Sequence, residues 1–281
     1  MKSGDMVDVG GTTSSWDTWF DHGEKFFKNN MVYYTLGNHD LVNDPDAVNF
    51  TNLMVQPPAP GDELYYSFVV GNSLFIGLNS EDASDSLQYN WLLNTLESNK
   101  DKKWKFVFFH RPFYTSPSHA GEMDYLFPTW WKAFDDYGVD VIFNGHTHNY
   151  QRTVPINRNI SDTSGVASYG HCPLNGRCQI VSGAAGAPMY GPGYGWFMAK
   201  SASIMHYVNI EVAGDSLVIK TFDYNNVMID SLMIFNTLNL NITCPWRNDT
   251  IAADKATRHV GSTMLTDDFN GDGLVDMVLG D

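Results

Sequence analysis

Hydrophobic residues recur at two different spacings along the first part of the chain. Three segments are predicted to be helices: residues 14–27, 85–96 and 128–137. Three short apolar runs between and after them are typical of buried strands: residues 31–36, 105–109 and 139–143. Because helix and strand signals alternate, this part of the chain is predicted to form an α/β fold rather than a pure β-barrel.

Two-residue turns divide several other strand signals. Gly71-Asn72 joins residues 65–70 to residues 73–79 and predicts a hairpin. Further along, three β runs at residues 206–212, 216–222 and 227–234 predict an antiparallel meander that forms a second sheet. We therefore expect an α/β sandwich over residues 1–236, a linker over 237–264, and a separate segment over 265–281.

Composition and charge exclude several classes of protein. The 281 residues include 17 Lys and Arg against 32 Asp and Glu, a net charge of −15, and 43% are hydrophobic. This apolar content excludes a disordered chain, and the acidic field argues against nucleic acid polymers as partners. No apolar run approaches the ~20 residues that span a bilayer. Cys172 and Cys178 bracket a short turn. The two residues could form a disulfide across this turn, or both could be free thiols.

Four short motifs follow strand signals and end in residues that bind metals or move protons. They are Gly4-Asp5, Gly-Asn-His-Asp at 37–40, Val-Phe-Phe-His at 107–110 and Gly-His-Thr-His at 145–148. In an α/β fold the carboxyl ends of strands converge on one crevice, so residues far apart in sequence can form one site. Carboxylate, amide and imidazole groups together form a ligand set for transition metals.

In this order and at these intervals, the motifs resemble those of the calcineurin-like metallophosphoesterase superfamily, and within it those of purple acid phosphatases. The resemblance covers roughly residues 3–235. It implies a four-layer α/β/β/α sandwich with two transition metal ions, Fe, Mn or Zn. By resemblance, Asp5 bridges both ions, one ion is held by Asn38, His110 and His146, and the other by His148. His39 and His119 are implied as the catalytic residues that face the substrate.

Two departures from the family pattern stand near the start of the chain. The family has an earlier Asp motif on a first strand, and only three residues precede Gly4 here, so we expect an N-terminally truncated piece of a longer enzyme. Asp8 stands where purple members carry a tyrosine that ligates iron, so the protein should not be purple. Tyr150 and Arg152 follow the last motif and either contact the substrate or pack the loop.

The last residues carry a separate signal. Asp268, Asn270, Asp272 and Asp276 follow the spacing of a calcium loop, but Leu279 stands where an EF-hand has its bidentate Glu. The segment resembles the start of an FG-GAP-like calcium repeat, and a solvated acidic tail is the alternative. Extracellular calcium would suit such a loop, which favours a secreted, extracellular or periplasmic protein.

The predicted function is metal-dependent hydrolysis of small phosphate esters, most simply as an acid-phosphatase-like phosphomonoesterase in which a metal-bound hydroxide attacks phosphorus. A phosphodiesterase or nucleotidase on the same site is one alternative. A non-catalytic, calcium-dependent binding or adhesion module is the other. Neither the oligomeric state nor the identity of the ester is encoded in a pattern that the sequence displays.

Overall fold

The structure is a computed structural model that describes residues 1–57, 64–157, 176–235, 263–267 and 276–280. The chain forms two compact units, Met1–Ile242 and Thr243–Asp281. The four motifs at 4–5, 37–40, 107–110 and 145–148 belong to the first unit. Among the described residues, none of the helices has the length and apolar character needed to cross a membrane.

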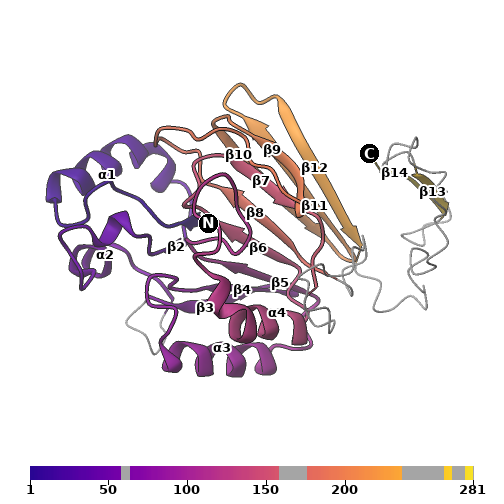
Figure 1. Ribbon diagram of the computed structural model, residues 1–281, viewed down its shortest axis with the longest axis horizontal. Coiled ribbons are helices and arrows are strands. Elements are labelled where there is room, and N and C mark those ends of the chain that lie inside the picture. The colour runs from indigo at the N-terminus through magenta and orange to yellow at the C-terminus, as the bar shows by residue number, and fades with distance from the viewer. Residues whose placement is uncertain (58–63, 158–175, 236–262, 268–275, 281) are drawn as a thin grey trace. The chain divides into compact units, whose positions relative to one another are not determined.

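A seven-stranded mixed sheet forms the centre of the first unit (Figure 1). Its strands, in spatial order, are β3 (Tyr66–Val70), β4 (Ser73–Gly77), β5 (Trp104–Phe108), β6 (Val141–Asn144), β8 (Cys178–Ser182), β7 (Tyr150–Thr153) and β9 (Met198–Ala202). The inner strands β4, β5, β6 and β8 run parallel, whereas β3 and β7 pair antiparallel with their neighbours. Every residue of β5 and β6 is buried, which confirms the two apolar runs as central strands.

Helices cover one face of this sheet. Helix α3 (Ser86–Ser98) begins after Asp85, whose carboxylate accepts hydrogen bonds from two backbone N–H groups of the first turn. A π-helical turn, η3 (Phe127–Trp131), leads into α4 (Lys132–Asp136), so the predicted helix at 128–137 is divided in two. Gln88, Leu92 and Leu96 form the buried stripe of α3. The apolar periodicity over 85–96 also placed Leu87 on this face, but Leu87 is 71% exposed, because it lies about 100° around the helix from Gln88 and farther from the other two.

A second sheet packs against the opposite face of the central sheet. It consists of β10 (His206–Ala213), β11 (Ser216–Asp223) and β12 (Met228–Phe235) in an antiparallel meander, as predicted. Alternate residues of β11 are buried, and Leu217 and Ile219 share a core with aromatic side chains of the central sheet. The layered α/β sandwich expected from the sequence is therefore confirmed.

Tyr150 and Arg152 join the two sheets. The Tyr150 hydroxyl donates to the Asp230 carboxylate at 2.7 Å, and the Arg152 guanidinium donates to both Asp230 oxygens at 2.7 and 3.0 Å. Tyr150 and Arg152 lie on β7 and Asp230 lies on β12, so these contacts favour the packing role of the two residues over substrate contact.

A third core lies around the N-terminal elements. The short strands β1 (Lys2–Ser3) and β2 (Tyr34–Thr35) pair in parallel, and α1 (Thr13–Phe27) and α2 (Val48–Leu53) lie beside them (Figure 1). The predicted strand at 31–36 is therefore only two residues long. Trp16 of α1 is fully enclosed, and its indole N–H donates to the Gly10 carbonyl. This core supports the loops that follow β1 and β2.

The second unit contains a strand pair. Strands β13 (Thr263–Asp267) and β14 (Asp276–Gly280) are antiparallel, with Asp267 opposite Asp276. Asp268, Asn270 and Asp272 of the predicted calcium loop lie outside the described residues, as does the side chain of Asp276. Cys178 is a buried free thiol, and Cys172, its predicted disulfide partner, also lies outside the described residues.

Candidate metal centre

Each predicted ligand stands just after a strand. Asp5 follows β1, Asn38 lies at the start of the 3₁₀ turn η1 (His39–Leu41) after β2, His110 follows β5, and His146 follows β6. All four strands run in parallel pairs, β1 with β2 and β5 with β6. The His110 ring Nδ1 donates to the Ser3 carbonyl at the end of β1 at 2.8 Å, which joins the two pairs.

Glycines in the motifs allow the loops to approach one another closely. A Cβ on Gly4 would lie 2.4 Å from His110 Nδ1, and a Cβ on Gly37 would lie 2.3 Å from both the backbone N and the Oδ1 of Asp5. Asp5 and His146 themselves have left-handed backbones, with φ of 50° and 64°. Left-handed conformations at residues other than glycine are strained and gather at functional sites.

Asp40, the last residue of the second motif, organises the loop after β1. Its side chain is fully buried and accepts four backbone N–H groups: those of Asp5, Met6, Val7 and Gly37. Burial raises the pKa of Asp40 to about 6, and the neighbouring Asp5 adds to this, against the N–H donors that lower it. The sequence analysis assigned no role to Asp40. Its place in a motif that begins with glycine could have indicated a structural role for its carboxylate.

Four side-chain atoms with lone pairs converge at the centre of the site. His110 Nε2 lies 3.0 Å from Asn38 Oδ1, 3.1 Å from Asp5 Oδ2 and 3.0 Å from His146 Nδ1. Because His110 Nδ1 donates to Ser3, a neutral His110 presents only a lone pair to the other three atoms. The structure therefore brings together Asp5, Asn38, His110 and His146, with their potential ligand atoms facing one another.

The side chains of the cluster shift one another's pKa values. Burial acts to raise the pKa of Asp5, but the hydrogen bond and charge of His110 outweigh it and lower that pKa to about 2. Burial acts to lower the pKa of His110, yet Asp5 raises it overall. Burial, followed by the neighbouring charge of His110, lowers the pKa of His146 to about 3, so His146 stays neutral. Asp5 and His110 thus stabilise each other's charged forms.

The cluster fits a transition metal ion. Two neutral imidazoles, a carboxylate and an amide oxygen form the mixed nitrogen and oxygen set that such ions prefer. Ligands held about 2.1 Å from an ion at right angles lie about 3 Å apart, which matches the separations here. Asp5, His110 and His146 also form one of two groups of potential metal ligands among the described residues.

The remaining predicted residues lie around this cluster. The His39 backbone N–H donates to Asp5 Oδ1 at 2.9 Å, and its ring Nδ1 donates to the Asp8 carbonyl at 2.9 Å. His148 does not join the four-atom cluster, because its Nδ1 donates to the Pro188 carbonyl at 2.9 Å and its ring stacks on Tyr190. His119 lies on the other side of His146, with 3.8 Å between the ring centroids.

Sequence reasoning missed Arg111 and Glu122, which also stand at the site. Glu122 Oε2 lies 3.1 Å from His146 Nε2, and its Oε1 lies 2.8 Å from His119 Nδ1. Arg111 donates to Glu122 and, through Nε and Nη2, to the carboxylate of Glu81. Neither residue belongs to a periodic pattern or a motif. The only feature of the sequence that could have indicated a role at the site was the position of Arg111 directly after His110.

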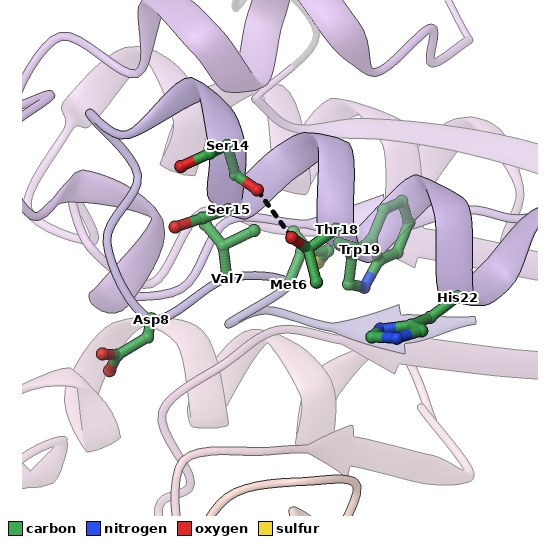
Figure 2. Close-up of a pocket in the computed structure, with 8 residues that line it drawn as sticks. All are labelled: Met6, Val7, Asp8, Ser14, Ser15, Thr18, Trp19 and His22. Carbon is green, nitrogen blue, oxygen red and sulfur yellow. Dashed lines mark hydrogen bonds between the residues drawn. The ribbon is translucent and has the colours of Figure 1, made fainter.

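An open hollow of about 440 Å³ begins beside the site, at Asp8. It is lined by Met6, Val7, Asp8, Ser14, Ser15, Thr18, Trp19 and His22. Figure 2 shows Asp8 and His22 at opposite ends of this set, with the serine and threonine residues of α1 between them. Asp8 is exposed, and its carboxylate lies 3.2 Å from His39 Nδ1.

The layered α/β fold and a cluster of carboxylate, amide and imidazole ligands define the chain as a protein of the metallophosphoesterase class. The family model for calcineurin-like phosphoesterases matches residues 3–150, more than half of the chain, and the chain belongs to this family.

Individual relatives are purple acid phosphatases. The chain is 29% identical over 189 residues to purple acid phosphatase 1 of Ipomoea batatas, covering 62% of this chain and 38% of the relative. It is also 29% identical over 192 residues to the Fe(3+)-Zn(2+) purple acid phosphatase 12 of Arabidopsis thaliana, with the same two coverages. The chain thus spans well under half the length of these relatives. The solved structure of the purple acid phosphatase PPD1 from yellow lupin seeds has the same fold, with a TM-score of 0.65 at 21% identity, over 83% of this chain and 45% of that one.

Proposed function

We propose that this protein hydrolyses small phosphate esters at the cluster of Asp5, Asn38, His110 and His146, most simply as an acid-phosphatase-like phosphomonoesterase. The convergence of three potential ligand atoms at 3.0–3.1 Å from a fourth, His110 Nε2, carries this proposal. Family membership and the purple acid phosphatase relatives support it.

We propose a dinuclear centre of Fe, Mn or Zn, by analogy with the relative named for Fe(3+) and Zn(2+). Asn38, His110 and His146 would hold one ion, Asp5 would bridge, and His148 would hold the second ion. When bound, the ions supply Lewis acidity for the phosphoryl oxygens and acidify the attacking water. The second ion has the weaker support, because only Asp5 and His148 are available to it among the residues singled out.

The chain's own residues would position the ester and its leaving group. The His39 N–H holds Asp5 Oδ1, and the Asp8 carbonyl accepts from His39 Nδ1 and fixes the ring. The imidazolium form of His39, protonated on both ring nitrogens, would donate its Nε2 proton to the leaving oxygen. His119, fixed through its Nδ1 by Glu122, would donate to a phosphoryl oxygen from Nε2 in its imidazolium form. Two donors on different loops would thus contact the ester from two directions.

Metal content and turnover test the proposal together. We expect the purified chain to bind Mn, Fe or Zn and to hydrolyse an aryl phosphate. Asp5→Asn should reduce both metal affinity and turnover by more than the about 10–100-fold that loss of an outer-shell partner costs. Asp46→Asn, at an exposed site, is the matched control. Failure to bind a transition metal supplied in excess would contradict the proposal.

The substrate panel separates the alternatives. A diester or nucleotide hydrolysed faster than the aryl monoester would indicate a phosphodiesterase or nucleotidase. Full metal binding without turnover of any of them would indicate the non-catalytic binding module. His148→Ala should remove one of two bound metal equivalents if the centre is dinuclear, and none if it holds one ion.

We also propose that residues 265–281 bind calcium through Asp268, Asn270, Asp272 and Asp276, as the start of an FG-GAP-like repeat after a linker at 237–264. Strands β13 and β14 pair with each other, and residues 268–275 lie between them in the sequence. Calcium titration of the full chain, with Asp272→Asn for comparison, should give a dissociation constant of about 10⁻⁴–10⁻³ M, as in extracellular modules. Such a value would also support a secreted protein. If isothermal titration calorimetry shows no heat of binding, the segment is better described as a solvated acidic tail.

A further inference from the structure

We propose that Glu122, held in place by Arg111, is a positioning residue for two histidines at once. Its carboxylate fixes the tautomer of His146, the proposed metal ligand, and orients the ring of His119. This inference rests on the proposed function, because it assumes that His146 binds a metal through Nδ1.

The two ring nitrogens of His146 face different partners. Nδ1 lies 3.0 Å from His110 Nε2, inside the cluster of ligand atoms, and Nε2 lies 3.1 Å from Glu122 Oε2. A neutral imidazole carries one proton, and a nitrogen that binds a metal must offer its lone pair. The proton of His146 must then be on Nε2, where the Glu122 carboxylate accepts it. Carboxylates in this position set the orientation and basicity of metal-bound histidines.

Arg111 holds Glu122 in the position that this contact requires. Its Nη1 donates to Glu122 Oε2 at 2.5 Å, while Nε and Nη2 donate to Glu81 at 2.8–3.0 Å. The Glu81 side chain is only 5% exposed, so it provides a fixed point, whereas the Glu122 side chain is 34% exposed. A planar guanidinium that bridges two carboxylates restricts the rotamers of the more exposed one.

Glu122 also connects the metal ligand to the histidine that faces the substrate. Its Oε1 accepts from His119 Nδ1 at 2.8 Å, and the rings of His119 and His146 are 3.8 Å apart. Each carboxylate oxygen therefore orients one histidine. Removing the carboxylate should weaken metal binding through His146 and substrate binding through His119.

A second arrangement would use the same atoms differently. His119, Glu122 and His146 form the other group of potential metal ligands among the described residues, so Glu122 could in principle ligate an ion itself. Arg111 argues against this, because its Nη1 contacts Glu122 and lies 3.4 Å from His146 Nε2. A permanent cation already stands where that ion would have to bind, which places Glu122 outside the coordination shell.

Glu122→Ala and Glu122→Gln test the inference, with Glu97→Ala on the exposed face of α3 as control. Metal affinity is measured by chelator competition, metal equivalents by elemental analysis at saturation, and ligand geometry by the visible absorption of the Co²⁺-loaded protein. We expect Glu122→Ala to keep every equivalent, to lose about 10–100-fold in affinity, to shift the Co²⁺ spectrum and to raise KM. Glu122→Gln should recover part of the affinity, because the amide oxygen can accept from His146 Nε2.

Each other outcome has its own meaning. Unchanged affinity and an unchanged Co²⁺ spectrum in Glu122→Ala would overturn the inference and leave the proposed function intact. Loss of a whole equivalent at saturation would also overturn it, because Glu122 would then be a ligand. A wild-type chain that binds no transition metal would refute the proposed function itself. Arg111→Met should reproduce the loss of affinity in weaker form, and no change there would remove Arg111 from the inference.

Discussion

Replacing Asp40 by Asn should destabilise the protein strongly, although the two side chains have nearly the same shape. Asp40 Oδ2 accepts from the N–H groups of Asp5 and Gly37 at 3.0 and 2.9 Å, and Oδ1 accepts from Met6 and Val7 at 2.9 and 3.3 Å. In either orientation, the Asn amide nitrogen would face two N–H donors that it cannot accept. An unsatisfied buried donor costs about 1–3 kcal/mol, so the two together cost about 2–6 kcal/mol.

This loss is large compared with the total stability of a domain, which is about 5–15 kcal/mol. Urea unfolding followed by tryptophan fluorescence measures it, with Asp46→Asn at an exposed position as the control. Because the lost N–H partners lie in the loop that carries Asp5, metal affinity should fall as well. A change in unfolding free energy below about 0.5 kcal/mol, similar to the control, would refute the reasoning, since such values are usual for surface substitutions.

Three further predictions concern pH, packing and backbone space. Burial raises the pKa of Asp140 to about 7, well above its unfolded value, so the folded state binds the extra proton and stability falls as pH rises from about 4 to 7. Asp140→Asn should flatten this slope in urea unfolding measured across that range, and an identical slope would count against it. Asp230→Ala should cost about 3–5 kcal/mol by leaving the Arg152 guanidinium unpaired, with metal affinity unchanged; weaker metal binding at equal folding would instead connect Arg152 to the site. Gly37→Ala should reduce metal affinity at least about tenfold in chelator competition, because its Cβ would displace Asp5; wild-type affinity would show that the loop yields freely.

Much of the fold could be predicted because periodicity reports burial directly. The apolar runs at 105–109 and 139–143 became β5 and β6, and the turns at Gly71-Asn72 and Gly214-Asp215 became hairpins. The order of strands at one end of the central sheet, where β8 lies between β6 and β7, was not predictable in this way. Pairing order depends on packing between distant segments, which local spacing does not encode.

The same distinction applies to the site. Asp5, Asn38, His110 and His146 were predicted because each stands in a motif after a strand, and the structure brings them together. Glu122 is not part of any motif and lies in a turn, and only the folded structure brings its carboxylate to His119 and His146. Likewise, only the approach of β7 to β12 shows that Arg152 has Asp230 as its partner.

The left-handed backbone at Asp5 and His146 bears on whether the centre is in use. A residue with a Cβ in this conformation costs about 1–2 kcal/mol relative to an ordinary one, and glycine would avoid the cost. The chain keeps both side chains at strained positions together with the neighbouring ligands. Two strained residues within one four-residue cluster are typical of a functional site, and this supports the proposed metal centre.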